Sequence, residues 1–198
     1  MSISSIIVLA LLVFVAVTIF KGVRIVPQGY KWIVQRLGKY HSTLNPGLNF
    51  VIPYIDEVAY KVTTKDIVLD IPSQEVITRD NAVLLMNAVA YINLTTPEKA
   101  VYGIENYSWA IQNLVQTSLR SIVGEMDLDD ALSSRDHIKA RLKASISDDI
   151  SDWGITLKTV EIQDIKPSHT MQAAMEEQAA AERQRRATVT KADGEKQA

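Results

Sequence analysis

The chain has 198 residues, a formal net charge of −2, 22% charged residues and no cysteine. The absence of cysteine excludes disulfides, thiol catalysis and cysteine-based zinc sites. The near-neutral charge gives no electrostatic footprint for nucleic acid as a partner. The length is sufficient for one or two small domains, each with a hydrophobic core.

The first element is an uncharged apolar run from Ile3 to Phe20. As a helix it spans about 27 Å, close to the ~30 Å hydrocarbon core of a bilayer, and we expect a single transmembrane anchor. A cleaved secretory signal is disfavoured because no basic residue precedes the run and Phe20-Lys21-Gly22 is a poor cleavage site. A buried helix of a soluble protein is disfavoured because the run has no polar stripe.

Two basic residues, Lys21 and Arg24, follow the apolar run, and no lysine or arginine precedes it. Positively charged flanks tend to stay in the cytoplasm. We therefore expect the N-terminus outside and the remaining domain in the cytoplasm.

Residues Leu48 to Ile55 form a second apolar concentration. Short apolar runs favour a core strand, here interrupted by Pro53. The alternative is an amphipathic loop that contacts the bilayer beside the anchor, with Phe50, Tyr54 and Ile55 at the interface.

The stretch from residue 27 to residue 94 alternates turn signals with strand-like segments. Ala82 to Leu94 is almost continuously apolar, which favours a central strand covered on both faces. Arg79-Asp80-Asn81 suits a tight hairpin before it. The other expected strands are Lys31–Leu37, Val58–Asp70 and Glu75–Thr78, with a break at Ile71-Pro72-Ser73.

Three helices and a strand are expected next. Thr96-Pro97-Glu98 begins a short helix that ends near Gly103. Residues 107–125 and 133–153 carry apolar side chains at steps of three and four, which predicts two amphipathic helices. Gly154 ends the last of these helices, and Ile155 to Ile165 is expected to form a strand.

The last element, from Ser168 onward, has no proline and is rich in alanine, glutamate, glutamine and arginine, which favours a long exposed helix. Large apolar side chains are sparse after Met171 and Met175. We therefore expect this helix to pack against copies of itself. The chain ends within the helix without a cap, which indicates a protein that continues further.

No catalytic motif is present: the sequence lacks Gly-x-Ser-x-Gly, His-Glu-x-x-His and phosphate-binding glycine loops. His41, His137 and His169 fall in unrelated elements. Two acidic clusters, 127–130 and 148–152, have the composition of a divalent-cation site, but their spacing favours solvated helix ends. We therefore expect no enzyme activity and no catalytic, metal or cofactor-binding residues.

Several stretches in this order resemble the SPFH or Band 7 superfamily, which includes stomatin, prohibitin, flotillin and HflK-HflC, and most of all bacterial stomatin-like membrane proteins of the QmcA type. The terminal KADGEKQ is similar to the first unit of that family's coiled-coil repeats. The stretches that carry the resemblance are VPQGYKWIVQRLGKY, LNPGLNFVIPYID, DIPSQEVITRDNAVLLMNAVAYINL and WGITLKTVEIQDIKP.

The resemblance implies an α+β fold: an N-terminal transmembrane helix, a two-part domain of mostly antiparallel strands with flanking helices, and the start of a long C-terminal coiled-coil helix. The expected boundaries are 1–24 for the anchor, 25–95 and 96–167 for the two subdomains, and 168–198 for the coiled-coil helix.

The resemblance also implies a function. We expect a single-pass protein of the bacterial inner membrane that acts as a scaffold, forms large homo-oligomeric rings or cages and organises a membrane microdomain. Its implied partners are membrane lipid and copies of itself. The alternative is a regulatory subunit that controls a membrane-bound protease, which would then be a further partner.

Overall fold

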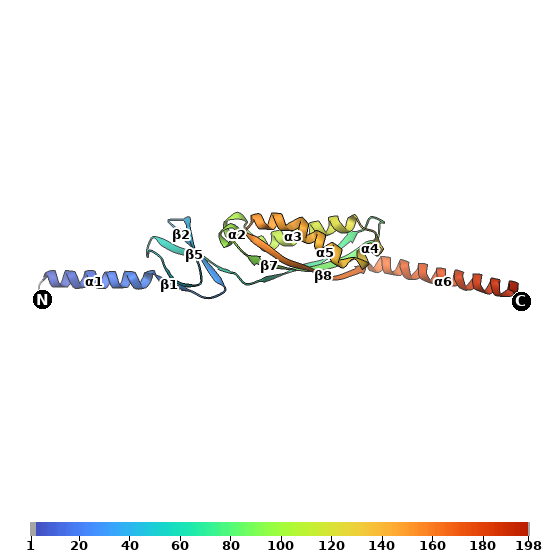
Figure 1. Ribbon diagram of the computed structural model, residues 1–198, viewed down its shortest axis with the longest axis horizontal. Helices are drawn as coiled ribbons and strands as arrows, with labels where there is room; N and C mark the ends of the chain where they lie inside the picture. The colour runs from blue at the N-terminus through green and yellow to red at the C-terminus, as the bar shows by residue number, and fades with distance from the viewer. Residues whose placement is uncertain (1–2, 198) are drawn as a thin grey trace. The chain divides into compact units, whose positions relative to one another are not determined.

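The computed structural model describes residues 3–197 as an α+β protein (Figure 1). The chain forms two compact units. The first contains the residues up to 68 together with 91–110 and 147–158, and the second contains 69–90, 111–146 and the residues from 159 onward. Each unit is therefore assembled from separate stretches of chain. The expected domain boundaries stay predictions.

The first unit contains two small sheets. β1 and β4 pair antiparallel, with Ile25 opposite Leu48. β2 pairs antiparallel with both β3 and β5, in the order β3-β2-β5. The elements that lie wholly within this unit are α1 (Ile3–Gly22), β1 (Val23–Val26), β2 (Tyr30–Arg36), β3 (Lys39–Leu44), β4 (Gly47–Phe50), β5 (Asp56–Thr63) and α2 (Pro97–Gly103).

The core of these two sheets is small. Val26, Val34 and Leu44 are buried together, and Trp32 and Val58 pack against them. Val26 belongs to β1, so one face of the β1–β4 sheet covers this core.

The remaining elements lie in the second unit or are shared between the two units. β6, β7 and β8 form a sheet in that order. These elements are β6 (Ile67–Ile77), β7 (Val83–Leu94), α3 (Tyr107–Gly124), α4 (Leu128–Ser133), α5 (Arg135–Asp152), β8 (Ile155–Pro167) and α6 (His169–Gln197). Figure 1 shows α6 leaving the end of β8 and extending away from the rest of its unit.

Several local predictions are confirmed. The hairpin between β6 and β7 turns at Asn81, whose φ is 65°, and the Thr78 amide donates to the Ala82 carbonyl across it at 2.9 Å. α2 begins at Pro97 with Thr96 as its N-cap. Gly154 follows α5 with a φ of 72°, a conformation that glycine adopts without strain.

Two strand predictions are wrong. The expected strand Val58–Asp70 is divided between β5 and β6, and Ile71-Pro72-Ser73 does not break β6. β6 is an edge strand. An edge strand tolerates proline because an outward-facing backbone position needs no ladder hydrogen bond.

The predicted transmembrane anchor over residues 1–24 is wrong, and so are the fold class that included it and the single-pass placement in a bacterial inner membrane. Within residues 3–197, no helix combines the length and the apolar character needed to cross a bilayer. The uncharged run covers eighteen residues, and α1 ends on Lys21 and Gly22. Residues 1 and 2 of the predicted anchor, and residue 198 of the predicted coiled-coil helix, lie outside the described residues.

Candidate functional site

The outer face of the β1–β4 sheet carries exposed apolar side chains. Ile25 and Leu48 are direct partners, as are Val23 and Phe50. Direct partners in an antiparallel pair point to the same face of the sheet. Ile25 and Phe50 are each 71% exposed, and Leu48 is also exposed. These side chains are therefore not part of the core. The interpretation of Leu48–Ile55 as a core strand is wrong for Leu48 and Phe50.

The turn after β4 adds three more exposed apolar side chains: Ile52, Tyr54 and Ile55. Tyr54 is 71% exposed and has a φ of 71°, which is unusual for a residue with a side chain. We call Ile25, Leu48, Phe50, Ile52, Tyr54 and Ile55 the apolar patch. The three site residues predicted from the sequence, Phe50, Tyr54 and Ile55, are thus all exposed, and their contact with a membrane stays a prediction.

Ile25 is a member of the patch that sequence reasoning missed. The feature that distinguishes Ile25 is its place in the short strand Val23–Val26, where Ile25 is exposed while its neighbour Val26 is buried. An apolar side chain on the face of β1 opposite the buried Val26 indicates that this outer face contacts something other than water.

The turn is held by Asp56. Its Oδ2 accepts a hydrogen bond from the Ile52 amide at 2.8 Å, and its Oδ1 accepts one from Arg36 Nε at 2.6 Å. The Asp56 side chain is only 3% exposed. The hydrogen bond from Arg36, followed by that from Ile52, lowers the pKa of Asp56 from 3.8 to about 2. The carboxylate therefore stays charged and keeps the turn in place at neutral pH.

The end of α1 is tied to the same turn. The Val51 amide donates to the Gly22 carbonyl at 2.9 Å, and a Cβ atom on Gly22 would lie 2.8 Å from the Val51 carbonyl oxygen. The Lys21 ammonium lies 5.5 Å from the centroid of the Tyr54 ring, within the range of a cation–π interaction. The patch and the end of α1 therefore form one continuous surface.

A second exposed surface belongs to α6. Ser168 is buried and caps the helix, since its Oγ accepts from the Met171 amide at 3.3 Å. The Ser168 amide donates to the Val83 carbonyl at 2.9 Å, which attaches the start of α6 to β7. From His169 to Val189, the part of α6 with described side chains, no side chain is buried.

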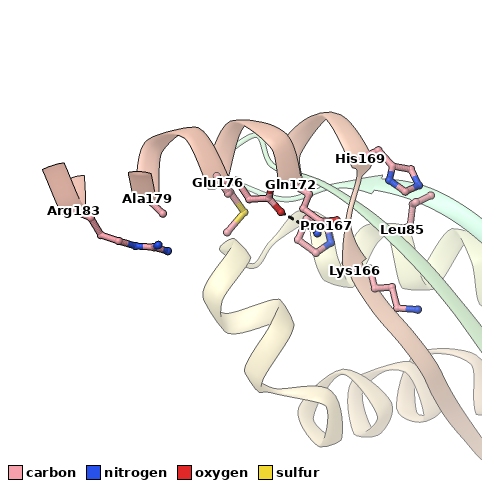
Figure 2. A pocket seen from close by; sticks show the side chains of 9 residues that line it. Leu85, Lys166, Pro167, His169, Gln172, Glu176, Ala179 and Arg183 are labelled. Atoms are coloured by element: carbon pink, nitrogen blue, oxygen red, sulfur yellow. Dashed lines mark hydrogen bonds between the residues drawn. The ribbon is translucent and has the colours of Figure 1, made fainter. Parts of the chain in front are cut away.

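A groove of ≈ 670 Å³ runs along the first turns of α6 (Figure 2). Gln172, Met175 and Ala179 recur at steps of three and four, so one face of the helix lines it. Gln172 Nε2 donates to Glu176 Oε1 at 3.4 Å within this face. The lining residues are Leu85, Lys166, Pro167, His169, Gln172, Met175, Glu176, Ala179 and Arg183.

The three histidines do not come together. His41, His137 and His169 are all exposed, and they lie in β3, α5 and α6. Asp127, in the first acidic cluster, pairs with Arg79. In the part of the chain that the structure describes, no group of three or more histidine or acidic side chains is arranged to hold a metal ion.

Comparison with known proteins finds related sequences along almost the whole chain. The SPFH domain / Band 7 family matches residues 24–196. A Methanocaldococcus jannaschii protein is 41% identical over 178 residues, which cover 90% of this chain and 89% of the relative. A stomatin homologue of Pyrococcus horikoshii is 41% identical over 196 residues, 99% of this chain and 72% of the relative. A Mycobacterium tuberculosis protein is 37% identical over 184 residues, 93% of this chain and 48% of the relative, so the chain spans about half the length of that protein.

Proposed function

Because the chain belongs to the SPFH domain / Band 7 family, we propose that it is a non-enzymatic scaffold that assembles with copies of itself on a membrane surface. The assemblies are large rings or cages, and they organise the membrane patch beneath them. The similarity to stomatin homologues of two Pyrococcus species supports this assignment.

The observation that carries the proposal is the exposure of α6. The helix runs for 29 residues, yet none of its described side chains from His169 to Val189 is buried. A helix in a folded protein obtains most of its stability from packing rather than from intrinsic propensity. The helix-capping contacts of Ser168 fix only its first turn. A neighbouring α6 would supply the missing contacts, with Met175 and Ala179 on the packed face.

The apolar patch supports the membrane part of the proposal. A sheet face in contact with water normally carries polar side chains, whereas Ile25, Leu48 and Phe50 are apolar and exposed. Interfacial segments bury such a face by about 5–10 Å at the boundary of headgroups and acyl chains. Lys21 and Arg24 lie beside the patch in the sequence, and basic side chains near a membrane surface strengthen binding to anionic lipids.

Confinement to a surface favours assembly. Many weak contacts between neighbours add up, and binding to a membrane raises the local concentration of copies. Ring closure would therefore need only modest affinity at each pair of neighbouring α6 helices.

Sedimentation velocity of the purified chain, measured over a wide range of concentration with and without vesicles, tests the proposal. We expect species larger than one copy that grow with concentration and on vesicles. A single copy under every condition would contradict the proposal.

Regulation of a membrane-bound protease, the other function implied by the family resemblance, stays a prediction. Co-purification from native membranes tests it. Recovery of a protease at stoichiometric level would support it, and recovery without one would count against it.

A further inference from the structure

A charged pocket lies on the inner side of the β1–β4 sheet. It has a volume of ≈ 320 Å³. Arg24 and Lys61 are its basic lining residues, and Trp32 is its aromatic one. The lining residues are Arg24, Trp32, Val51, Asp56, Glu57, Val58 and Lys61.

The two cations reach the pocket from different sheets: Arg24 lies on β1 and Lys61 on β5. Lys61 is the direct partner of Trp32 in the pairing of β2 with β5, and its ammonium lies 4.6 Å from the centroid of the Trp32 ring. A ring at this distance orients the ammonium while leaving its N–H donors available. Arg24, on β1, is exposed. Arg24 and Val51 both line the pocket.

The carboxylates of the lining do not cancel these cations. Asp56 is already paired with Arg36 and is 3% exposed, so its charge is compensated inside the unit. Arg24 and Lys61 contribute two positive charges and Glu57 one negative charge, which leaves one net positive charge facing the pocket. A pocket with an arginine fork, an ammonium and a net positive charge favours an oxyanion such as a phosphate.

The position of the pocket relative to the apolar patch decides which phosphate it takes. Arg24 and Ile25 are adjacent on β1, so their side chains point to opposite faces of the sheet. Val51 lines the pocket, and its neighbours Phe50 and Ile52 belong to the patch. If the patch contacts acyl chains, the pocket lies about one sheet thickness above them. The headgroup layer of a bilayer is about 5–8 Å thick on each side, so the pocket lies at the level of the lipid phosphates.

We propose that this pocket binds the phosphate of an anionic phospholipid whose acyl chains lie against the apolar patch. The inference rests on the proposed membrane-surface function and adds to it a lipid class and a binding site. Arg24 would hold the phosphate by two parallel hydrogen bonds, and Lys61, positioned by Trp32, would donate a third.

Vesicle binding tests the proposal. The full chain is mixed with phosphatidylcholine vesicles, with or without phosphatidylglycerol, and the bound fraction is measured by co-sedimentation. We expect Arg24→Lys to weaken binding to the phosphatidylglycerol vesicles about fivefold, since the charge is kept but the paired hydrogen bonds are lost. Binding to phosphatidylcholine vesicles should be unchanged.

Lys65→Gln is the matched control for loss of a positive charge. The Lys65 ammonium lies 5.8 Å from the Tyr30 ring, in the same kind of contact as Lys61, but Lys65 does not line the pocket. Lys61→Gln should weaken binding to phosphatidylglycerol vesicles several-fold more than Lys65→Gln. Equal losses of binding in the two variants would mean that vesicle binding depends only on the total charge of the protein, and they would overturn the proposal.

The Trp32 indole N–H signal in a nuclear magnetic resonance spectrum separates a lipid from free phosphate. It should shift with soluble short-chain phosphatidylglycerol and shift much less with inorganic phosphate at the same concentration. An equal response to inorganic phosphate would overturn the lipid assignment.

The outcomes also separate this inference from the proposed function. If the native chain binds both kinds of vesicle and Arg24→Lys changes nothing, the pocket inference fails while the membrane-surface function stands. If the native chain binds neither, both fail.

Discussion

Helices α5 and α6 are both highly polar, yet they differ completely in what they bury. Every fourth residue of α5 from Ile138 to Ile150 is an isoleucine or leucine, and all four of these side chains are 0% exposed. The described part of α6 has Met171 and Met175 near its start and mostly alanine or charged residues after them, and it buries none of them.

This difference shows where each helix obtains its stability. The apolar stripe of α5 is covered by its own chain, and such burial contributes about 1.5–3 kcal/mol for each large side chain. In its part with described side chains, His169 to Val189, α6 has no comparable buried stripe, and its first turn is held by the contacts of Ser168. Small side chains such as alanine let two helices approach closely, so the composition of α6 suits a partner helix better than it suits its own core.

The largest effect is expected from the buried stripe of α5. Leu142→Ala should lower the free energy of unfolding by about 2–5 kcal/mol, because it leaves a cavity among closely packed side chains. Urea unfolding measures this change. The matched control is Val189→Ala in α6, where the side chain is 52% exposed and a change within about 0.5 kcal/mol is expected. Comparable losses of unfolding free energy in the two variants would contradict the claim that α5 and α6 differ in the stability they obtain from burial.

The next effect concerns assembly. Ala179 lines the groove and is half-buried, whereas Ala181 lies on another face of α6 and is exposed. Ala179→Glu should weaken association of copies about tenfold or more, because it forces a charge into the packed face. Ala181→Glu should weaken it far less. Sedimentation velocity of the two variants distinguishes them, and identical behaviour would place the contact elsewhere.

A smaller, local effect is expected at the turn of the apolar patch. Because Arg36 lowers the pKa of Asp56 from 3.8 to about 2, the ion pair stabilises the fold above pH ~4, and this stabilisation is lost as the pH falls towards 2. The protection factor of the Ile52 amide, which compares its exchange rate with that of an unstructured amide at the same pH, should fall over that range, while the aliphatic stripe of α5 has no such titration. In Asp56→Asn the Ile52 amide should exchange fast already at neutral pH. An Ile52 amide that keeps its full neutral-pH protection both in acid and in Asp56→Asn would refute the role of Asp56.

The smallest effect is expected on the exposed surface of α6. Glu182 accepts hydrogen bonds from Arg185 Nε and Arg186 Nε, both at 3.0 Å, and these bonds lower its pKa. Glu182→Gln should reduce helicity only slightly, and high salt should remove the difference, because exposed ion pairs are screened. Circular dichroism at low and high salt measures both. A large, salt-independent loss of helicity would mean that Glu182 contacts more than its own helix.

The elements set by local chemistry could be predicted from the sequence. The proline at the start of α2, the apolar spacing of α3 and the glycine after α5 place these helices within a residue or two of the structure. Each signal acts over one or two turns of chain, so no distant contact is needed to read it.

The short strands depend on distant pairing. Sequence reasoning missed β1 and placed β4 only as part of the longer apolar run Leu48–Ile55. β1 and β4 each have four residues, too few for an alternating pattern to stand out. Their register brings Ile25 beside Leu48. For this reason the sequence predicted Phe50, Tyr54 and Ile55 as site residues, but not Ile25. The ion pair between Arg36 and Asp56 was not predicted either, because two opposite charges that lie twenty residues apart in the sequence give no local signal.

The anchor prediction failed for a different reason. It rested on the apolar character of one run and on its helical length of about 27 Å, which comes close to the ~30 Å hydrocarbon core. These two properties identify a candidate span, and they do not by themselves establish that the helix crosses a bilayer.

Disulfide cross-linking at α6 tests the central claim most directly, because the chain has no cysteine of its own and an introduced cysteine is unique. A disulfide between copies requires Cα atoms within about 7 Å. Ala179→Cys should give covalently linked pairs under mild oxidation, and Ala181→Cys should give few or none. Absence of linked pairs from both variants, at concentrations where assemblies form, would contradict the claim that α6 packs against its neighbour through the groove face.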